Sequence, residues 1–219
     1  VFVEGALVGE TCDIEVVSSK KKVINARATN IHSPSDERQA PFCPVFDVCG
    51  GCQLHHIKPD AALEQRDRAL KVMMERHLAM KPQVWQAPLA GPRPQYRRKA
   101  RLAIDARNPT QIKLGFREAN SSNVINVETC PILVDPLSKL IGPLRDALTG
   151  FESARHIGHI SLIAGDNTSH LVIKHTKALE AELIDAVSEL VSTSSSVGVC
   201  GIELKLENKQ GQIRSVGRG

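Results

Sequence analysis

The sequence has 219 residues, of which 42% are hydrophobic, 24% charged and only 3% aromatic, so its core must be built mainly from aliphatic side chains. A net charge of +4 is mildly basic and identifies no partner by itself. No apolar run reaches the length of a membrane span and no signal peptide is visible, which argues against a membrane protein; with six cysteines, we expect a reducing, cytoplasmic compartment rather than a secreted disulfide scaffold.

The N-terminal residues are rich in strand formers. The chain starts directly in such a run, without a methionine, and it ends without a natural stop, so we expect a fragment of a longer protein. Glycines and the polar run 18–22 separate short strand-like runs, which predicts a small β-barrel with the lysines capping a hairpin; the runs are 2–3, 14–17 and 23–26. The polar, proline-flanked residues 33–42 indicate a linker.

Four cysteines form a three-plus-one pattern. Cys43, Cys49 and Cys52 lie within one short stretch, and Cys130 lies far downstream. Four thiolates can hold a structural zinc ion or an iron–sulfur cluster. Zinc sites usually have two Cys-x-x-Cys pairs, so this spacing favours a 4Fe-4S cluster and leaves zinc as the alternative. With four cysteine ligands no iron stays open to substrate, which indicates a structural role.

Two glycines and two histidines accompany this cysteine loop. Gly50 and Gly51 precede its last cysteine, and we expect them to adopt positive φ and to bring backbone N–H groups to the sulfurs. His55 and His56 follow the loop and are expected to be packing or surface residues.

The middle of the chain predicts one helix and three strands. The helix is expected from about Ala61 to His77, with Asp60 as its cap and an apolar stripe along one side. Residues 84–95 contain three prolines and indicate an irregular connection. Strands follow, the first two joined by a turn at Asn108-Pro109 and the third leading to Cys130, at 97–104, 111–117 and 124–127.

The last third mixes helices and strands. Asp135 is expected to cap a helix at about 136–148, which Gly150 ends. Further elements are expected as strands at 157–164 and 170–175, a helix at 178–191, and strands at 199–206 and 211–216. Since strands follow strands as often as helices, we expect an α+β domain with a mainly antiparallel sheet.

Basic residues crowd the strands at 97–104 and 111–117, where only Asp105 and Glu118 oppose them. Guanidinium groups interleaved with aromatic rings contact phosphates and stack on bases, so we predict a nucleic-acid-binding surface in preference to a merely solvated strand face. Arg93 and Arg107 belong to the same basic cluster. The residues predicted to contact nucleic acid are Tyr96, Arg97, Arg98, Lys99, Arg101, Lys113, Phe116 and Arg117.

Several catalytic and nucleotide-binding patterns are not found. The sequence has no Gly-x-Gly-x-x-Gly turn, no P-loop and no Ser-His-Asp pattern. Cys12 and Cys200 are expected to be structural thiols. We therefore assign no catalytic residue, and an electron carrier is the weakest hypothesis because it leaves the basic strands unexplained.

The chain resembles bacterial 23S rRNA (uracil-5-)-methyltransferases of the type that carries a TRAM domain and an iron–sulfur cluster and modifies U1939. The blocks that carry the resemblance are Gly5 to Glu10, Cys43 to Gln53, Tyr96 to Leu102, Leu114 to Arg117, Cys130 to Leu133 and Arg155 to His159.

The resemblance implies a domain plan: a partial, OB-like TRAM domain at 1–38, the iron–sulfur loop at 39–58 and a central RNA-binding α+β domain at 59–219. It implies that the four cysteines of the three-plus-one pattern bind a 4Fe-4S cluster and that the partner is 23S rRNA. In this family, S-adenosylmethionine and the catalytic groups lie in a C-terminal Rossmann-like domain, which this sequence lacks. We therefore expect the chain to be a monomer without methyltransferase activity of its own; the alternative is a non-enzymatic zinc or iron–sulfur RNA-binding module.

Overall fold

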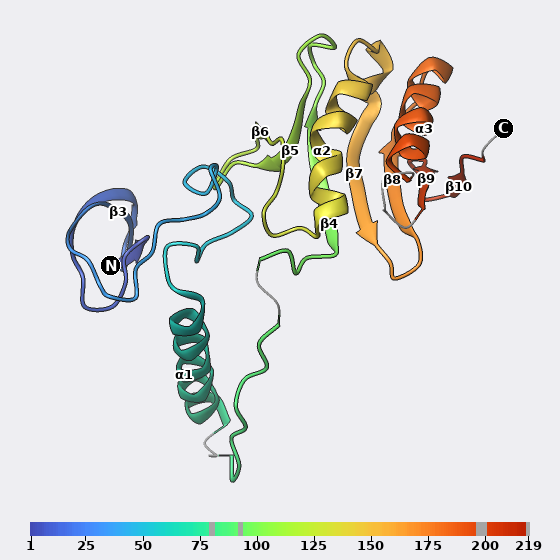
Figure 1. Cartoon of the computed structure of the whole chain (residues 1–219). Helices are drawn as coiled ribbons and strands as arrows, with labels where there is room; N and C mark the ends of the chain where they lie inside the picture. Colours follow the sequence, from blue (N-terminus) through green and yellow to red (C-terminus); the bar gives the residue numbers. More distant parts are fainter. Residues whose placement is uncertain (79–81, 92–93, 196–200, 218–219) are drawn as a thin grey trace. The chain divides into compact units, whose positions relative to one another are not determined.

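The structure is a computed structural model that describes residues 1–78, 82–91, 94–195 and 201–217. The chain divides into two compact units (Figure 1). The N-terminal unit comprises Val1–Phe46 and Cys52–Ala90, and the C-terminal unit comprises Asp47–Gly51 and Gly91–Gly219. This division differs from the expected domain plan, since the helix after the cysteine loop belongs with the N-terminal strands. Among the described residues, no helix is long and apolar enough to cross a membrane.

The N-terminal unit contains one three-stranded sheet in the order β1-β3-β2. Its strands are β1 (Phe2–Glu4), β2 (Thr11–Lys20) and β3 (Val23–Ser33). β2 and β3 form an antiparallel hairpin, and β1 pairs with β3 in parallel. The lysine run lies at the hairpin turn as predicted, where Lys21 has a φ of 37°.

The residues after β3 are not the loose linker that the sequence predicts. The Glu10 side chain has no accessible surface, and it accepts hydrogen bonds from Nε and Nη2 of Arg38, both at 2.5 Å. It also accepts the backbone N–H groups of Leu7 at 2.7 Å and Ser35 at 3.1 Å. These bonds, led by the Arg38 contact, lower the pKa of Glu10 to about 2. The carboxylate therefore fastens the segment after β3 to the sheet.

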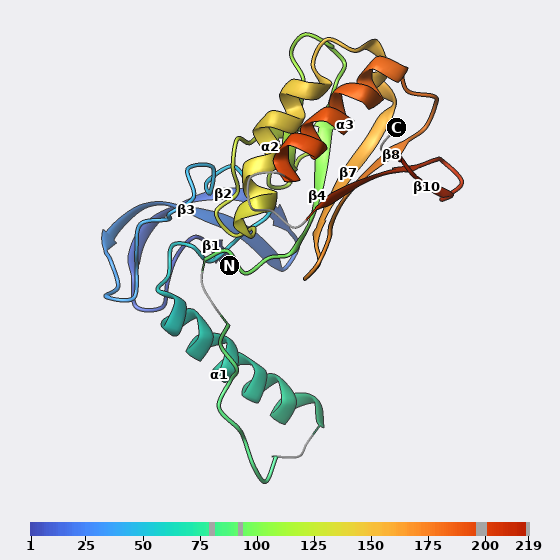
Figure 2. The same ribbon diagram turned by 45° about the vertical axis from the view of Figure 1, so that its right-hand side comes forward.

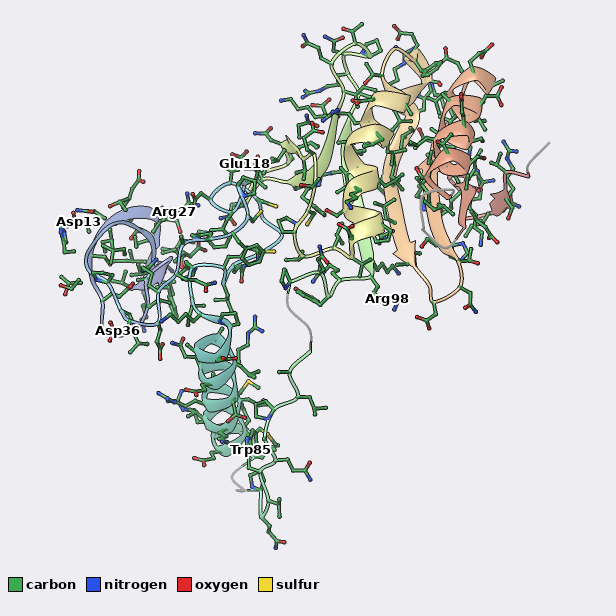
Figure 3. All side chains as sticks on the ribbon, viewed as in Figure 1. Asp13, Arg27, Asp36, Trp85, Arg98 and Glu118 are labelled. Carbon is green, nitrogen blue, oxygen red and sulfur yellow. The ribbon has the colours of Figure 1, made fainter. Side chains whose placement is uncertain are left out.

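Helix α1 (Pro59–Leu78) completes the N-terminal unit and buries none of its residues. The expected apolar stripe is thus present in the sequence but unburied here, and Asp60 lies in the first turn instead of capping it. Trp85, at the far end of α1 in Figure 3, donates its indole N–H to Asp67 at 2.7 Å. Lys71 pairs with Asp67 at 2.7 Å and lies 5.1 Å from the Trp85 ring centre, so the irregular residues after α1 are held against it.

A seven-stranded sheet forms the C-terminal unit, in the order β10-β9-β8-β7-β4-β5-β6. The strands are β4 (Lys99–Asp105), β5 (Lys113–Arg117), β6 (Val124–Asn126), β7 (Ile157–Ala164), β8 (Ser169–His175), β9 (Ile202–Glu207) and β10 (Ile213–Ser215). Every neighbouring pair is antiparallel except β8 and β9, which confirms the expected mainly antiparallel sheet. The parallel pair is the one joined through a helix, as a parallel connection requires.

Helices α2 (Asp135–Leu148) and α3 (Ala181–Ser195) both pack on one face of this sheet (Figure 2). A short 3-10 turn, η1 (Glu152–His156), precedes β7. The core between helices and sheet is aliphatic, as the composition predicts, and includes Leu102, Leu114, Ile141, Leu144, Ile160, Leu162, Leu171, Ile173, Leu183 and Val187. We call the opposite side the open sheet face; it is formed by the alternate residues of β4, β5, β7, β8 and β9 that point away from α2 and α3.

Three local predictions need correction. Val134 is the N-cap of α2, and Asp135 is its first helical residue, paired with Lys139 at 2.5 Å. Arg97 precedes β4 instead of lying in it, and it forms an isolated parallel bridge with Leu133. α3 begins three residues later than expected, at Ala181. The first two residues of the strand expected at 199–206 and the side chain of Arg93 lie outside the described residues.

Gly115 in β5 allows a close approach to β6. A Cβ at this position would overlap the backbone carbonyl oxygen of Ile125 and approach the Val127 side chain at 2.8 Å. We expect Gly115→Ala to destabilise the C-terminal unit by roughly 2 to 4 kcal/mol, because backbone has to move. Urea unfolding followed by hydrogen exchange of β5 and β6 measures the effect.

The matched control is Gly158→Ala in β7, where the nearest atom to the added Cβ would be the Lys174 carbonyl oxygen at 3.7 Å, an ordinary contact. Equal unfolding midpoints for the two variants would contradict the steric argument.

Candidate functional site

A short piece of the cysteine loop joins the C-terminal unit beside the end of β5. Cys49 forms an antiparallel bridge with Glu118. Gly50 donates its N–H to the Arg117 carbonyl, and Ala119 donates to the Val48 carbonyl, both at 3.0 Å. The position of Cys49 is therefore set by backbone pairing with residues about 70 positions later in the chain.

The two glycines of the loop let neighbouring atoms approach the backbone closely, and they do not adopt unusual backbone angles. Neither has a positive φ, so that expectation is wrong. A Cβ on Gly50 would lie 3.2 Å from the Arg117 carbonyl oxygen, which explains why only glycine fits comfortably between these strands. The N–H of Gly51 donates to Sγ of Cys49 at 3.4 Å, as the sequence predicts for an amide near a thiolate ligand.

Cys130 lies between β6 and α2 and is 8% exposed. Its backbone N–H donates to the buried Ser138 hydroxyl at 2.9 Å, and its carbonyl accepts the Leu133 N–H at 3.0 Å. Both backbone polar groups of Cys130 are thus hydrogen-bonded, which fixes its backbone between β6 and α2.

The other two cysteines belong to the N-terminal unit, together with an aromatic cluster. The His55 ring stacks on Phe42, with ring centres 4.2 Å apart, and on Phe46 at 5.3 Å. His56 is 7% exposed, and burial lowers the pKa of both imidazoles. Within the described residues, Nδ1 of each histidine is buried without a hydrogen-bond partner. Both are packing residues, as expected, but they also leave two unused polar atoms in the cysteine loop.

The donor set fits a cluster chemically, although the structure gathers no complete metal site. The described cysteines form no disulfide. Cys43 and Cys52 belong to the N-terminal unit and Cys49 and Cys130 to the C-terminal unit. Among the described residues, no three cysteine, histidine or carboxylate side chains meet as metal ligands. The soft thiolates, the amide near Cys49 and the unpartnered imidazole nitrogens are the features that suit an iron–sulfur cluster.

Four of the predicted basic residues lie on the open sheet face. Lys99 and Arg101 alternate with buried Ala100 and Leu102, so they lie on the open sheet face. In β5, the exposed Lys113 and Arg117 alternate with the buried Leu114 and lie on this same face. The Arg117 guanidinium donates to the Ser122 carbonyl at 2.6 Å.

Ion pairs occupy two of the basic side chains. Arg98 pairs with Asp166 at 2.8 Å and donates to the Ala164 carbonyl at 3.1 Å, at the lower end of β4 in Figure 3. Arg107 pairs with Asp105 at 2.6 Å and lowers the pKa of that carboxyl to about 2. Arg97, Lys99, Arg101 and Lys113 form no ion pair within the described residues, so their charges are the ones available to an anionic partner.

The two aromatic residues predicted to stack on bases differ in position. Tyr96 is 50% exposed, and the Arg97 guanidinium lies 6.0 Å from its ring centre. Phe116 shares its side of β5 with Leu114, facing α2 and away from Lys113 and Arg117. Tyr96 therefore has the exposure that stacking requires, whereas Phe116 is half-buried on the side of the sheet that faces the helices.

The open sheet face carries further charged residues that were not predicted from the sequence, because each strand was considered alone. His159 and Lys174 are register partners on β7 and β8. Lys174 in turn pairs with Glu207 of β9 at 2.6 Å. The alternation of the predicted strands at 157–164 and 170–175 could have placed these side chains on one face, but only the strand order shows that β7 lies beside β4 and that β8 follows β7.

Comparison with known proteins gives a consistent set of relatives. No family model matches the chain. It is 68% identical over 216 residues to the 23S rRNA (uracil(1939)-C(5))-methyltransferase RlmD of Alteromonas mediterranea, covering 99% of this chain and 44% of that protein. It is 53% identical to the RlmD of Alteromonas naphthalenivorans, over 86% of this chain and 40% of that one. For the RlmD of Shewanella baltica the identity is 35%, over 99% of this chain and 47% of that one.

A solved structure has the same fold. The tRNA (uracil-54, C5)-methyltransferase of Pyrococcus abyssi, crystallised with S-adenosyl-L-homocysteine, matches 99% of this chain and 50% of its own with a TM-score of 0.65 and 18% identity. The chain spans less than half the length of the curated relatives it matches. Over nearly all of its own length it is therefore similar to part of the 23S rRNA (uracil(1939)-C(5))-methyltransferases RlmD.

Proposed function

We propose that this chain is the RNA-binding and cluster-bearing part of an S-adenosylmethionine-dependent 23S rRNA uracil-C5 methyltransferase. The observation that carries the proposal is the 68% identity to an RlmD protein across 99% of the chain. In this proposal the methyl donor and the reacting uracil are bound by parts of the enzyme that this chain does not span. The chain alone is then inactive in methyl transfer, and its own contribution is to hold RNA.

The four cysteines of the three-plus-one pattern are the proposed ligands of a 4Fe-4S cluster. A bound cluster supplies cross-linking between chain segments, in place of a larger apolar core. Cys43, Cys49, Cys52 and Cys130 share this role as ligands in the proposal. The backbone pairing of Cys49 beside β5 and the hydrogen bond from the Cys130 N–H to the Ser138 hydroxyl fix the backbone at two of these residues and support the proposal.

RNA is proposed to contact cationic side chains just before β4, on β4 and at the start of β5. Arg97, Lys99, Arg101 and Lys113 supply charge without a carboxylate partner in the described part of the chain, and exposed Tyr96 supplies a ring for a base. The three N-terminal strands, taken as part of a TRAM domain at 1–38, are a second proposed RNA contact. A TRAM domain together with a cluster favours the U1939 specificity in the name of the relatives.

The pair Arg97→Ala and Arg101→Ala tests the RNA surface. We expect binding of a short single-stranded RNA to weaken about tenfold, and the slope of log affinity against log salt to fall by about 1 to 2, because two phosphate contacts are lost. Fluorescence anisotropy across a salt series measures both quantities.

The matched control is Arg107→Ala, because that guanidinium is already paired with Asp105. We expect it to change affinity less than about twofold. Equal losses for the control and the double variant would show that only net charge matters and would remove Arg97 and Arg101 from the proposed site.

A further inference from the structure

The middle of the open sheet face carries a cluster of charged side chains from four strands. His159 on β7 is opposite Lys174 on β8. Arg101 on β4 is opposite Ser161, two residues from His159 on the same face, which makes Arg101 and His159 diagonal neighbours. Lys174 is opposite Glu207 on β9, and their side chains pair at 2.6 Å.

Positive charge exceeds negative charge in this cluster. Arg101 and Lys174 act on His159 from either side, and Glu207 is the only carboxylate among the described residues that acts on it. Glu207 already binds Lys174, while Arg101 forms no ion pair within the described part of the chain. Lys174 has three N–H donors, so the pair to Glu207 leaves two of them for another acceptor. These charged side chains therefore include one more cation than carboxylates, and one bound anion would balance them.

His159 is the titratable centre of this arrangement. Its side chain is half-buried, and burial first, then Arg101 and Lys174, lowers the pKa of its imidazole, while Glu207 opposes them. An anion placed between Arg101 and Lys174 would cancel the two repulsive charges and accept an imidazole N–H. Such an anion therefore favours the protonated ring.

We propose that Arg101, His159 and Lys174 form a binding site for one phosphodiester group of RNA, and that His159 takes up a proton when the phosphodiester binds. The ligand class rests on the proposed function, since the chain is taken to bind rRNA. Ser161, between Arg101 and Val172 on the same face, adds a hydroxyl donor beside the site.

The neighbouring part of the face explains why the site lies here. On β9, Glu203 pairs with Lys205 at 3.2 Å, and its carboxylate lies 3.4 Å from Nδ1 of His170 on β8. That side is neutralised internally, whereas the β4 side holds unpaired Arg101 and Lys99. A polyanion that follows the charge would cross from β4 to β8 over His159 and stop before β9.

The sign of the pH effect follows from proton uptake. A phosphodiester does not titrate near neutral pH, so a proton taken up from the solvent on binding must be held by a group of the protein. Binding must then tighten as the pH falls through the pKa of the imidazole. With about a quarter to a half of a proton taken up on average over this range, affinity rises roughly threefold to tenfold from pH 8 to pH 6.

The first experiment measures binding of a 12-nucleotide single-stranded RNA to the 219-residue chain between pH 6 and pH 8 at fixed salt. The parent chain should show the threefold to tenfold gain, and His159→Gln should reduce it to less than about twofold. His170→Gln, on the same face but paired with Glu203, is the control and should keep the gain. A gain that survives in His159→Gln, or is lost in His170→Gln alone, overturns the proposal.

A second experiment does not depend on RNA. Sulfate keeps its charge over this pH range, and NMR of the histidine ring follows His159 during a pH titration with and without it. Sulfate should raise the pKa of His159 by about half a unit or more, and the double variant Arg101→Gln and Lys174→Gln should abolish the shift. An unchanged His159 titration overturns the anion site. If sulfate acts as expected but the parent chain binds no RNA, the anion site stands and the proposed function fails.

Discussion

Cys130→Ala is expected to remove the iron–sulfur cluster from the protein. Purified without oxygen, the parent chain should be brown, with a broad absorbance near 400 nm and about four irons and four sulfides per chain. The variant should lose most of that iron, because the remaining cysteines leave one corner of the cluster without its thiolate. The position is otherwise supported by backbone bonds, so the C-terminal unit should stay folded. Iron, sulfide and absorbance are measured together with circular dichroism.

Cys12→Ala is the matched control, since this half-buried thiol of β2 has no part in the proposed ligand set. It should keep the full iron content. A colourless parent protein that carries one zinc per chain would contradict the iron–sulfur assignment and support the zinc alternative. Full iron content in Cys130→Ala would remove this residue from the ligand set.

Glu10→Gln is expected to destabilise the N-terminal unit by about 2 to 4 kcal/mol, because it leaves the Arg38 guanidinium partly buried without its countercharge. The amides of Leu7 and Ser35 donate to this carboxylate, so their hydrogen exchange should accelerate together. Exchange at these two amides reports on the N-terminal unit even if the C-terminal unit unfolds separately.

The same residue predicts a pH dependence. The pKa of Glu10 is lowered to about 2 from an ordinary value of 4.5, so its ionised form stabilises the fold above pH 4.5. This contribution is lost as the pH falls from about 4.5 to about 2, and the loss should be absent in Glu10→Gln. Glu15→Gln, at an exposed position of β2, is the control and should keep the acid sensitivity of the parent. A parent and a Glu10→Gln variant with parallel acid unfolding curves would contradict the assignment.

Local patterns predicted the elements well where burial alternates. The expected strand at 157–164 coincides with β7, and the helix at 136–148 differs from α2 by one residue. Caps were less predictable, because capping depends on backbone angles: Val134, without any side-chain bond, occupies the position expected for Asp135. For α1 the helix was predicted but its environment was not: the apolar spacing indicates a helix, and none of its residues is buried.

The sequence singled out the residues of the candidate site but could not predict how they are arranged. Spacing identified the four thiols, and charge density identified β4 and β5. Strand order decides the rest: Arg98 finds Asp166 across β7, and Phe116 faces the helices. Such contacts join residues far apart in sequence, and no local period encodes them.

The pairing of Cys49 with Glu118 cannot form until Glu118 has been synthesised, which orders the steps of folding during translation. The two residues are about 70 positions apart, which takes on the order of 4 to 14 seconds to synthesise. During that interval the loop has no partner strand, and Cys130, the last of the proposed ligands in sequence, is synthesised later still. If the proposed cluster binds, its delivery should therefore follow the synthesis of α2, because the proposed ligand set is incomplete before then.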